Sequence, residues 1–327
     1  MKFAILGAGA WGTALAISFS ARHQVVLWGR EPRHLEALRR ERANTRYLPG
    51  ISLPADLAFE PNLERALDSA EMVLLATSTN GFAPTLKAVV KLVNTLPLIW
   101  ACKGFETPGD RLLHETAAKY LAPGTPAGAL SGPSFALEVA QGKPTALTLA
   151  SLDAEYALRM AAELNSPALR IYSSQDLIGV ELGGALKNVM AIAAGVSDGL
   201  GLGNNARAAL ITRGLAEMVR LGIAMGGQPE TFMGLTGLGD LVLTATGDLS
   251  RNRTVGKRLA QGAPLNVILD ELGHVAEGVL SAGAARDLAI KYAVDMPITA
   301  AVCALLFDGA SPTDTVRRLL ARDPKAE

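Results

Sequence analysis

The chain of 327 residues is longer than one ordinary hydrophobic core requires, so its length predicts two domains. Hydrophobic residues make up 49% of it and charged residues 19%, which is typical of a folded globular protein and excludes a largely disordered chain. Lysine plus arginine and aspartate plus glutamate number 31 each, so no net charge draws the chain to nucleic acid or to a membrane surface, and neither partner is expected.

The N-terminal segment allows two interpretations. Lys2, the apolar run after it and the small residues Ser18 and Ser20 are compatible with a secretory signal peptide. A signal peptide depends on bulk hydrophobicity alone, however, and has no use for glycines at positions 7, 9 and 12. We therefore interpret the segment as part of the folded protein.

Up to about Ser174, short aliphatic runs alternate with helix-length segments, which predicts a doubly wound α/β domain with a parallel sheet over residues 1–175. The runs are continuously apolar, as expected for strands that helices cover on both faces. Strands are expected at 3–6, 24–28, 72–75, 98–101, 127–130, 146–149 and 169–172. Helices are expected at 12–21, 32–42, 84–91, 111–120 and 154–164, with a further helix start near 61–64.

From residue 176 to residue 327 the predicted elements are all helical. The expected helices are 177–196, 206–225, 235–243, 253–261, 279–291 and 299–307. The segment 182–196 is the most apolar, but it contains Lys187 and Asn188 and is interpreted as a buried helix of a soluble protein; no membrane-spanning helix is expected. The many alanines and glycines of this all-α domain permit close helix contacts and suggest a homodimer.

The first expected strand and helix enclose the loop Gly7-x-Gly9-x-x-Gly12. The glycine spacing alone is a weak signal. It becomes specific because an apolar strand precedes the loop, a helix begins at it, and a second strand follows at 24–28. Gly7 permits a tight turn, Gly9 lets the backbone approach a pyrophosphate, and Gly12 lets helix and strand pack closely. The helix N-terminus offers free N–H groups to the phosphates. This context predicts a Rossmann domain that binds a nicotinamide dinucleotide, with a glycine-rich turn without a ligand as the alternative.

The residues after the second strand bear on which dinucleotide is used. NAD-specific sites usually carry an acidic residue there, whereas this chain has Arg30, which can pair with the 2′-phosphate of NADP and stack on adenine. Glu31 lies one position further on and leaves NAD possible. We expect NADP to be preferred or both to be accepted; the alternative for Arg30 is an exposed arginine at a helix start.

Polar residues at five other places form a candidate substrate site. Lys103 directly follows the fourth strand, where the carboxyl end of the sheet opens onto a ligand cleft. The segment 131–136 follows the fifth strand and turns into a helix, with Ser134 as a candidate cap. Lys187 is a lone cation inside an apolar helix, which is costly to bury unless it is paired or functional; a side chain that reaches the surface is the alternative. Asp240 and the segment 250–253 precede or open helices, and the latter can form an anion site or an ordinary polar cap.

Together these segments resemble the bacterial type of NAD(P)-dependent sn-glycerol-3-phosphate dehydrogenase along nearly the whole chain. The most specific matches are Ser-Gly-Pro-Ser-Phe-Ala at 131–136, Gly-Ala-Leu-Lys-Asn at 184–188 and Ser-Arg-Asn-Arg at 250–253. The resemblance implies reversible reduction of dihydroxyacetone phosphate to sn-glycerol 3-phosphate, which feeds glycerophospholipid synthesis. It implies Lys187 as the general acid–base. The implied substrate contacts are Lys103, Gly132, Ser134, Asp240, Ser250, Arg251 and Asn252, and the implied cofactor contacts are Trp11, Arg30, Lys103, Ala136, Arg251, Val275 and Glu277, with Tyr47 as a further member.

These residue types suit the implied reaction. An ammonium group can stabilise and protonate the oxygen on which charge develops during hydride addition, and burial near Lys103 would lower the pKa of Lys187 towards the working range. Asp240 would orient either Lys187 or a substrate hydroxyl. Arg251 with its two neighbours would hold the phosphate and so position the carbonyl.

Two alternative functions differ in their sequence features. β-Hydroxyacid and 6-phosphogluconate dehydrogenases resemble Lys-x-x-x-Asn on the helix, but here the residue four after Lys187 is Ala191 and Asn188 is adjacent. A non-catalytic dinucleotide sensor would share the fold, yet it has little need of the second polar cluster that contains Lys103 and Asp240.

The cysteines and histidines predict no disulfide and no metal site. Cys102 and Cys303 lack CxxC spacing and suit a reducing cytoplasm, where the protein is expected. The histidines at 23, 34, 114 and 274 form no ligand pair at helical spacing.

Overall fold

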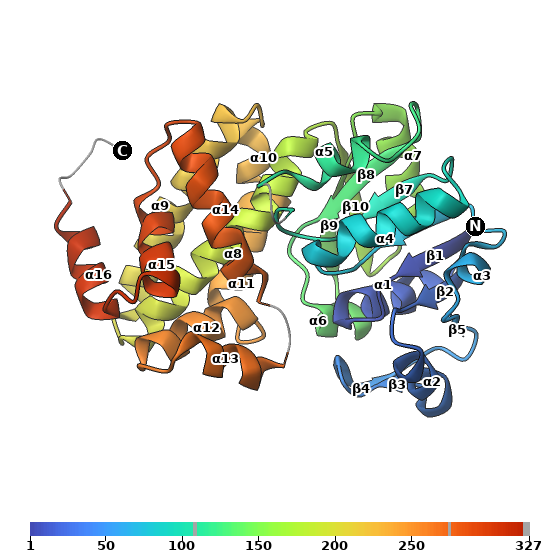
Figure 1. The fold of residues 1–327 in the computed structure, drawn as a ribbon, viewed down its shortest axis with the longest axis horizontal. Helices are drawn as coiled ribbons and strands as arrows, with labels where there is room; N and C mark the ends of the chain where they lie inside the picture. Colours follow the sequence, from blue (N-terminus) through green and yellow to red (C-terminus); the bar gives the residue numbers. More distant parts are fainter. Residues whose placement is uncertain (107–109, 274–275, 323–327) are drawn as a thin grey trace.

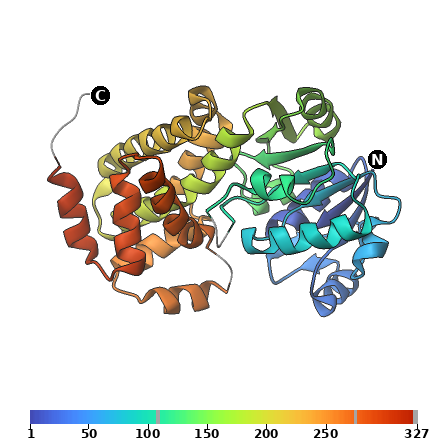
Figure 2. The same cartoon turned by 45° about the horizontal axis from the view of Figure 1, so that its top comes forward.

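The structure is a computed structural model that describes residues 1–106, 110–273 and 276–322, and it consists of an α/β domain followed by a helical domain (Figure 1 and Figure 2). The α/β domain is built on an eight-stranded sheet in the order β10-β9-β8-β7-β6-β1-β2-β5. Its strands are β1 Lys2–Leu6, β2 Gln24–Trp28, β5 Ala58–Phe59, β6 Met72–Leu75, β7 Leu98–Trp100, β8 Ala127–Ser131, β9 Thr145–Ala150 and β10 Leu169–Ser174. The strands β3 Ala43–Asn44 and β4 Leu48–Ser52 form a separate antiparallel pair.

The predicted doubly wound fold is confirmed, with one correction to the strand directions. Neighbouring strands of the large sheet are parallel except β8 and β9, which are antiparallel. A parallel return needs a crossover that spans the sheet. Between β8 and β9 the chain forms only the five-residue helix α6 Ala136–Ala140, which packs against helix α1. The chain therefore enters β9 in the opposite direction.

Alternating side chains of the strands supply a hydrophobic core on each face of the sheet. Phe3 and Ile5 of β1 contribute to one core, while Ala4 and Leu6 contribute to the other. Helices α1 Ala10–Ser20 and α7 Ala154–Leu164 cover the first face, and α3 Leu63–Leu67, α4 Thr79–Leu92 and α5 Leu113–Ala118 cover the second. Helix α2 Pro32–Glu41 follows β2. The N-terminal segment thus forms the middle of the sheet and its first helix, as the folded interpretation predicts.

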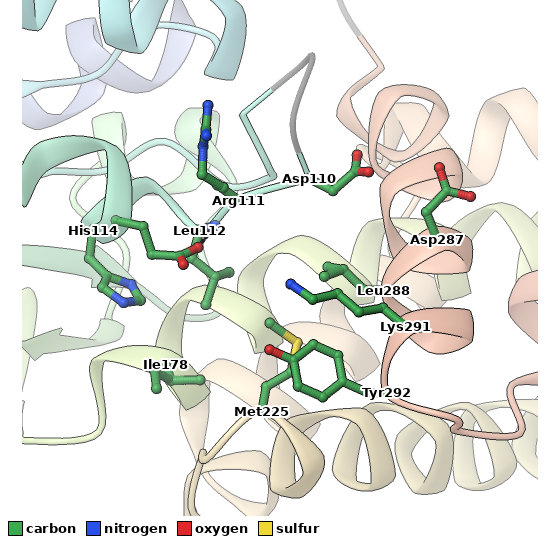
Figure 3. Close-up of a pocket in the computed structure, with 11 residues that line it drawn as sticks. Asp110, Arg111, Leu112, His114, Ile178, Met225, Asp287, Leu288, Lys291 and Tyr292 are labelled. Atoms are coloured by element: carbon green, nitrogen blue, oxygen red, sulfur yellow. Dashed lines mark hydrogen bonds between the residues drawn. The ribbon is translucent and has the colours of Figure 1, made fainter. Parts of the chain in front are cut away.

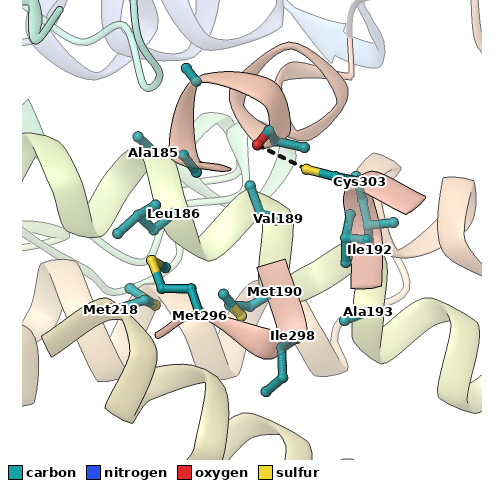
Figure 4. Close-up of a cluster of buried hydrophobic side chains, with 14 of the residues drawn as sticks. Ala185, Leu186, Val189, Met190, Ile192, Ala193, Met218, Met296, Ile298 and Cys303 are labelled. Atoms are coloured by element: carbon teal, nitrogen blue, oxygen red, sulfur yellow. Dashed lines mark hydrogen bonds between the residues drawn. The ribbon is translucent and has the colours of Figure 1, made fainter. Parts of the chain in front are cut away.

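Helix α8, Leu177–Gly199, is the centre of the helical domain (Figure 1). Around it are α9 Gly203–Ala224, α10 Pro229–Met233, the π-helical turn η1 Leu235–Gly239, α11 Asp240–Thr246, α12 Arg251–Ala260, α13 Leu265–Leu272, α14 Glu277–Lys291, α15 Pro297–Phe307 and α16 Pro312–Leu320. Figure 4 shows side chains of α8 such as Leu186, Val189 and Met190 among Met218, Met296 and Ile298. Among the described residues, α8 alone is long and apolar enough to cross a membrane, but almost all of its most apolar stretch is buried inside this domain.

Several predicted helix boundaries differ from those in the structure. Helix α4 begins at Thr79 and carries Pro84 inside it, whereas the sequence pattern predicts a start at Pro84. Proline is favoured at the first turn, but burial of Phe82 against the sheet extends this helix further back. The single helix predicted at 235–243 is divided into a π-helical turn and α11.

Backbone contact between α8 and α12 locks the helical domain together. A Cβ atom on Gly195 would lie 2.0 Å from the carbonyl oxygen of Arg253, and a Cβ on Gly256 would lie 2.0 Å from that of Ile192. Glycine is therefore required on both helices at their point of closest approach.

We expect Gly256→Ala to destabilise the protein by about 1–3 kcal/mol or more, because the new methyl group must displace the backbone of α8. Gly283→Ala on α14 is the matched control: no atom lies within 4 Å of its new Cβ, and alanine is favoured over glycine in a helix by up to about 1 kcal/mol. Urea unfolding of both variants measures the difference. Equal stabilities would contradict the proposed backbone contact.

Candidate active site

The glycine loop has the geometry of a phosphate cradle. Gly7 adopts a φ of 131°, and a Cβ on it would lie 2.5 Å from the carbonyl oxygen of Ala76. A Cβ on Gly12 would lie 1.9 Å from the carbonyl oxygen of Gly7. Gly9, by contrast, has no atom within 4 Å of its Cβ position, and it is the N-cap of α1 without a side-chain cap. Space and free N–H groups therefore coincide at Gly9, which fits a dinucleotide pyrophosphate.

Two side chains outside the motif hold this loop in place. The carbonyl oxygen of Ala8 accepts a hydrogen bond from Nδ2 of Asn44 (3.1 Å) and lies 3.2 Å from Nε2 of His34. Nδ2 of Asn44 also donates to Oγ1 of Thr13 at 2.8 Å. The ring of Tyr47 packs edge-on against His34, which brings this predicted cofactor residue near the loop. Sequence reasoning missed Asn44, which lies in a two-residue strand without a motif.

The other predicted residues of the nucleotide site lie around the same loop. Arg30 is exposed between β2 and α2. Its neighbour Glu31 forms an ion pair with Arg46 at 2.9 Å. Trp11, in the first turn of α1, packs with Ala136 in a small apolar cluster, and its indole Nε1 is buried with no hydrogen-bond partner among the described residues.

A buried carboxylate lies between two lysines from different domains. Oδ1 of Asp240 is 2.6 Å from Nζ of Lys187, and its Oδ2 is 2.7 Å from Nζ of Lys103. Lys187 also donates to Oγ1 of Thr244 at 2.8 Å, and Lys103 donates to the carbonyl oxygen of Gly132 at 2.8 Å. The structure thus brings together four predicted residues, and it adds Thr244, one helical turn after Asp240.

The charges of this cluster alter the proton affinities of its members. Burial lowers the pKa of Lys187 to about 8; Asp240 opposes this effect, while the nearby cation Lys103 adds to it. Burial alone would raise the pKa of the Asp240 carboxyl, but the two lysines outweigh burial and hold that pKa below its usual range. An anionic Asp240 therefore lies beside a lysine that can exchange a proton near neutral pH.

Gly132 and Ser134 line the same region, but Ser134 is not a helix cap. Gly132 has a φ of 136°, which turns its carbonyl oxygen to Lys103. Helix α6 is preceded by Phe135 as its N-cap, without a side-chain hydrogen bond. The hydroxyl of Ser134 instead donates to the carbonyl oxygen of Gly132 at 3.0 Å. The predicted capping role is wrong because the helix begins one residue too late for it.

The segment that opens α12 is a cap, as one of its two interpretations predicts. Oγ of Ser250 accepts from the backbone N–H of Arg253 at 3.2 Å. Asn252 is buried: its Nδ2 donates to Oδ1 of Asn188 at 2.9 Å, and its Oδ1 accepts from the N–H of Gly278 at 3.0 Å. Arg251 is exposed, yet its charge contributes to lowering the pKa of Lys187. The charge of Arg251 therefore acts on the lysine cluster as well as on Glu277.

Glu277 extends the site to the start of α14. Its Oε2 accepts a hydrogen bond from Oγ1 of Thr79 in the α/β domain at 2.7 Å. Burial raises the pKa of the Glu277 carboxyl above its usual value, although Thr79 and Arg251 oppose the effect. Thr79 was missed because the predicted helix start was placed at Pro84. Val275, another predicted cofactor residue, lies outside the described residues.

Comparisons with known proteins agree across both domains. The family model of the NAD-dependent glycerol-3-phosphate dehydrogenase N-terminus matches residues 2–157, and that of the C-terminus matches residues 176–317. The chain is 55% identical to glycerol-3-phosphate dehydrogenase [NAD(P)+] of Thiobacillus denitrificans, over 100% of both chains. It is 56% identical to the protein of the same name from Ralstonia nicotianae, over 100% of this chain and 99% of that one. The crystal structure of glycerol-3-phosphate dehydrogenase from Coxiella burnetii is 41% identical with a TM-score of 0.94, and the match covers 98% of this chain and 99% of that one.

Proposed function

The chain belongs to the NAD-dependent glycerol-3-phosphate dehydrogenase family, and we propose that it reduces dihydroxyacetone phosphate to sn-glycerol 3-phosphate with Lys187 as the general acid. It is an NAD(P)-dependent oxidoreductase. The observation that carries the assignment of Lys187 is its buried ammonium group, which is held by Asp240 and has a pKa of about 8. The reaction is reversible, so the same amine acts as the base when the alcohol is oxidised.

Bound NAD(P)H supplies the hydride, and the residues of the chain manage the charge that develops on the ketone oxygen. Lys187 donates its proton to that oxygen, while Lys103 adds a second positive charge at the same site. Asp240 orients Lys187, because its Oδ1 accepts from that ammonium group at 2.6 Å. Its Oδ2 accepts from Lys103 and keeps a lone pair with which it can also accept from a substrate hydroxyl. Thr244 fixes the amine from another side.

The remaining predicted substrate residues are suited to the phosphate. Arg251 supplies an exposed guanidinium, and Ser250 retains a hydroxyl proton beside the N-terminus of α12. Asn252 uses Nδ2 once and keeps its second N–H for a ligand. Gly132 and Ser134 complete the substrate contacts from the α/β domain. Binding the phosphate away from the carbonyl lets remote binding energy position the reacting group.

We assign the cofactor contacts to the glycine loop, Trp11, Arg30, Tyr47, Lys103, Ala136, Arg251, Val275 and Glu277. The product is a building block of glycerophospholipids, so we place the reaction at the entry to their synthesis, in the cytoplasm. A homodimer is proposed from the small residues of the helical domain.

We expect Lys187→Ala to lower kcat for dihydroxyacetone phosphate reduction by about 100- to 10,000-fold, the range for loss of a general acid. NADPH binding, followed by fluorescence titration, should remain because Lys187 is on α8 and is not among the proposed cofactor contacts. Near-normal turnover would remove Lys187 from the mechanism.

The pKa of Lys187 predicts opposite pH dependences for the two directions. Reduction needs the protonated amine, so kcat should fall as the pH rises through about 8; oxidation of glycerol 3-phosphate needs the neutral amine and should become faster over the same interval. Initial rates of both reactions, measured from about pH 6 to about pH 10 in steps of about half a pH unit, test these opposite pH dependences. The same direction of change in both reactions would contradict the assignment.

We expect NADP to be preferred through Arg30, and Arg30→Ala to lower kcat/KM for NADPH by about tenfold while NADH changes little, since only NADPH carries the 2′-phosphate. Arg33→Ala, three residues further along and also exposed, is the matched control. An unchanged ratio of the two specificity constants in Arg30→Ala would exclude Arg30 as the determinant.

A further inference from the structure

A buried carboxylate joins the two domains at a second place, on the same helix as Lys187. Oε1 of Glu181 accepts from Nε1 of Trp100 at 2.8 Å and from the backbone N–H of His114 at 3.1 Å. Its Oε2 lies 2.5 Å from Nδ1 of His114. Glu181 is on α8, Trp100 ends β7 and His114 belongs to α5. One carboxylate therefore links the helical domain to two elements of the α/β domain.

Hydrogen-bond donors surround the buried carboxylate of Glu181. Its side chain and that of Trp100 are buried, and a carboxylate in such a place is costly unless donors satisfy it. Burial alone would lower the pKa of His114, but the hydrogen bond and charge of Glu181 outweigh burial and raise that pKa. His114 lines an interdomain cavity of about 210 Å³ together with Ile178 of α8 and Lys291 of α14. Figure 3 shows these side chains around the cavity. His114 therefore lies between this cavity and Glu181, with Nδ1 directed at the carboxylate.

Two of the elements that Glu181 connects, β7 and α8, position the two lysines of the active site. Lys103 follows Trp100 by three residues, and Lys187 follows Glu181 by six, which is about 9 Å along a helix. Between them the stem of Lys103 packs against α8 at Gly184, where a Cβ would lie 3.5 Å from Cγ of Lys103. A small shift of β7 along α8 would therefore change how Lys103 reaches Asp240, and with it the separation between Lys103 and Lys187.

We propose that Glu181 is a positioning residue for the reaction: by tying β7 and α5 to α8, it sets Lys103 and Lys187 at the separation that the shared carboxylate of Asp240 requires. The proposal rests on the function proposed for Lys187. Glu181 does not contact the substrate; it acts through the geometry of the two lysines. Displacement of a catalytic group by about 1 Å can slow a reaction by about 100-fold, so a modest loosening is enough to be measured.

The test compares Glu181→Gln with a second buried glutamate that has no link to the α/β domain. Glu217 on α9 accepts from the N–H of Ile298 (2.6 Å) and from the N–H and Oγ1 of Thr299 (3.1 and 3.0 Å), all within the helical domain. Glu217→Gln removes a comparable buried charge and is the matched control. Trp100→Phe removes the indole donor to Glu181 and part of a buried ring system, and it retains an aromatic ring beside Phe82.

The measurement is the single-turnover rate of NADPH oxidation by saturating dihydroxyacetone phosphate in a stopped-flow instrument, with enzyme in excess over NADPH. We expect Glu181→Gln to slow the hydride-transfer phase by about 10- to 100-fold, Trp100→Phe to slow it by less, and the dissociation constants of both ligands to change by less than about threefold. Glu217→Gln should keep the wild-type rate. A variant that is merely less stable loses amplitude, because fewer molecules are folded, but it does not lose rate.

A wild-type rate in both Glu181→Gln and Trp100→Phe would overturn the proposal, as would equal slowing in Glu217→Gln. If Glu181→Gln does not fold, the rate of Trp100→Phe decides. Lys187→Ala in the same instrument keeps the two ideas apart. Normal hydride transfer there refutes the acid role of Lys187, whatever the Glu181 variants do, whereas slow transfer there with normal Glu181 variants refutes only the positioning role.

Discussion

The sharing of one buried carboxylate by two lysines is the interaction on which the site depends. Asp240 is completely buried and would be costly as an unpaired anion; Lys187 would be equally costly as an unpaired cation. The ion pair between them offsets the cost of burying each charge, and Lys103 adds a second positive charge from the other domain. The arrangement leaves one positive charge in excess, at the place where the ketone oxygen becomes negative during the proposed reaction.

The need to pair buried carboxylates with donors explains how the two domains contact each other. Among the described residues, the contacts that join them near the site include Lys103 with Asp240, Thr79 with Glu277, and Trp100 with Glu181. In each, a residue near the carboxyl end of a strand, or at the start of the helix that follows, meets a carboxylate from a helix. The carboxyl edge of the sheet is where a doubly wound domain binds its dinucleotide, so the same edge serves both the cofactor and the closure of the site.

Sequence patterns predicted those features of the fold and the site that depend on residues close together in the sequence. The tight turn at Gly7 and the close packing at Gly12 agree with the geometry of the loop, although Gly7 is also confined by Ala76, which lies far along the chain. The role of Gly9 at a pyrophosphate stays a prediction. The isolation of Lys187 in an apolar helix already indicated a partner. That the partner is Asp240, shared with Lys103, follows only from packing of segments that are far apart in the sequence. The direction of β9 was not predictable, because an apolar run does not indicate whether its strand lies parallel or antiparallel to the neighbouring strand. Ser134 was misassigned as a cap because a one-residue difference in the start of α6 turned its hydroxyl to Gly132. Asn44 and Thr79 belong to no motif, whereas Thr244 could have been found from its four-residue spacing from Asp240.

The glycine contact between α8 and α12 has a consequence for substrate selection. Helices whose backbones touch at Gly195 and Gly256 cannot slide or rotate against each other, so Lys187 and the start of α12 at Ser250 and Arg251 belong to one rigid body. On the proposed roles, helix packing then fixes the span between the phosphate and the carbonyl. On the same roles, a ketose phosphate one carbon longer would present its carbonyl at a different distance from Lys187, so the helix contact would select substrates by length.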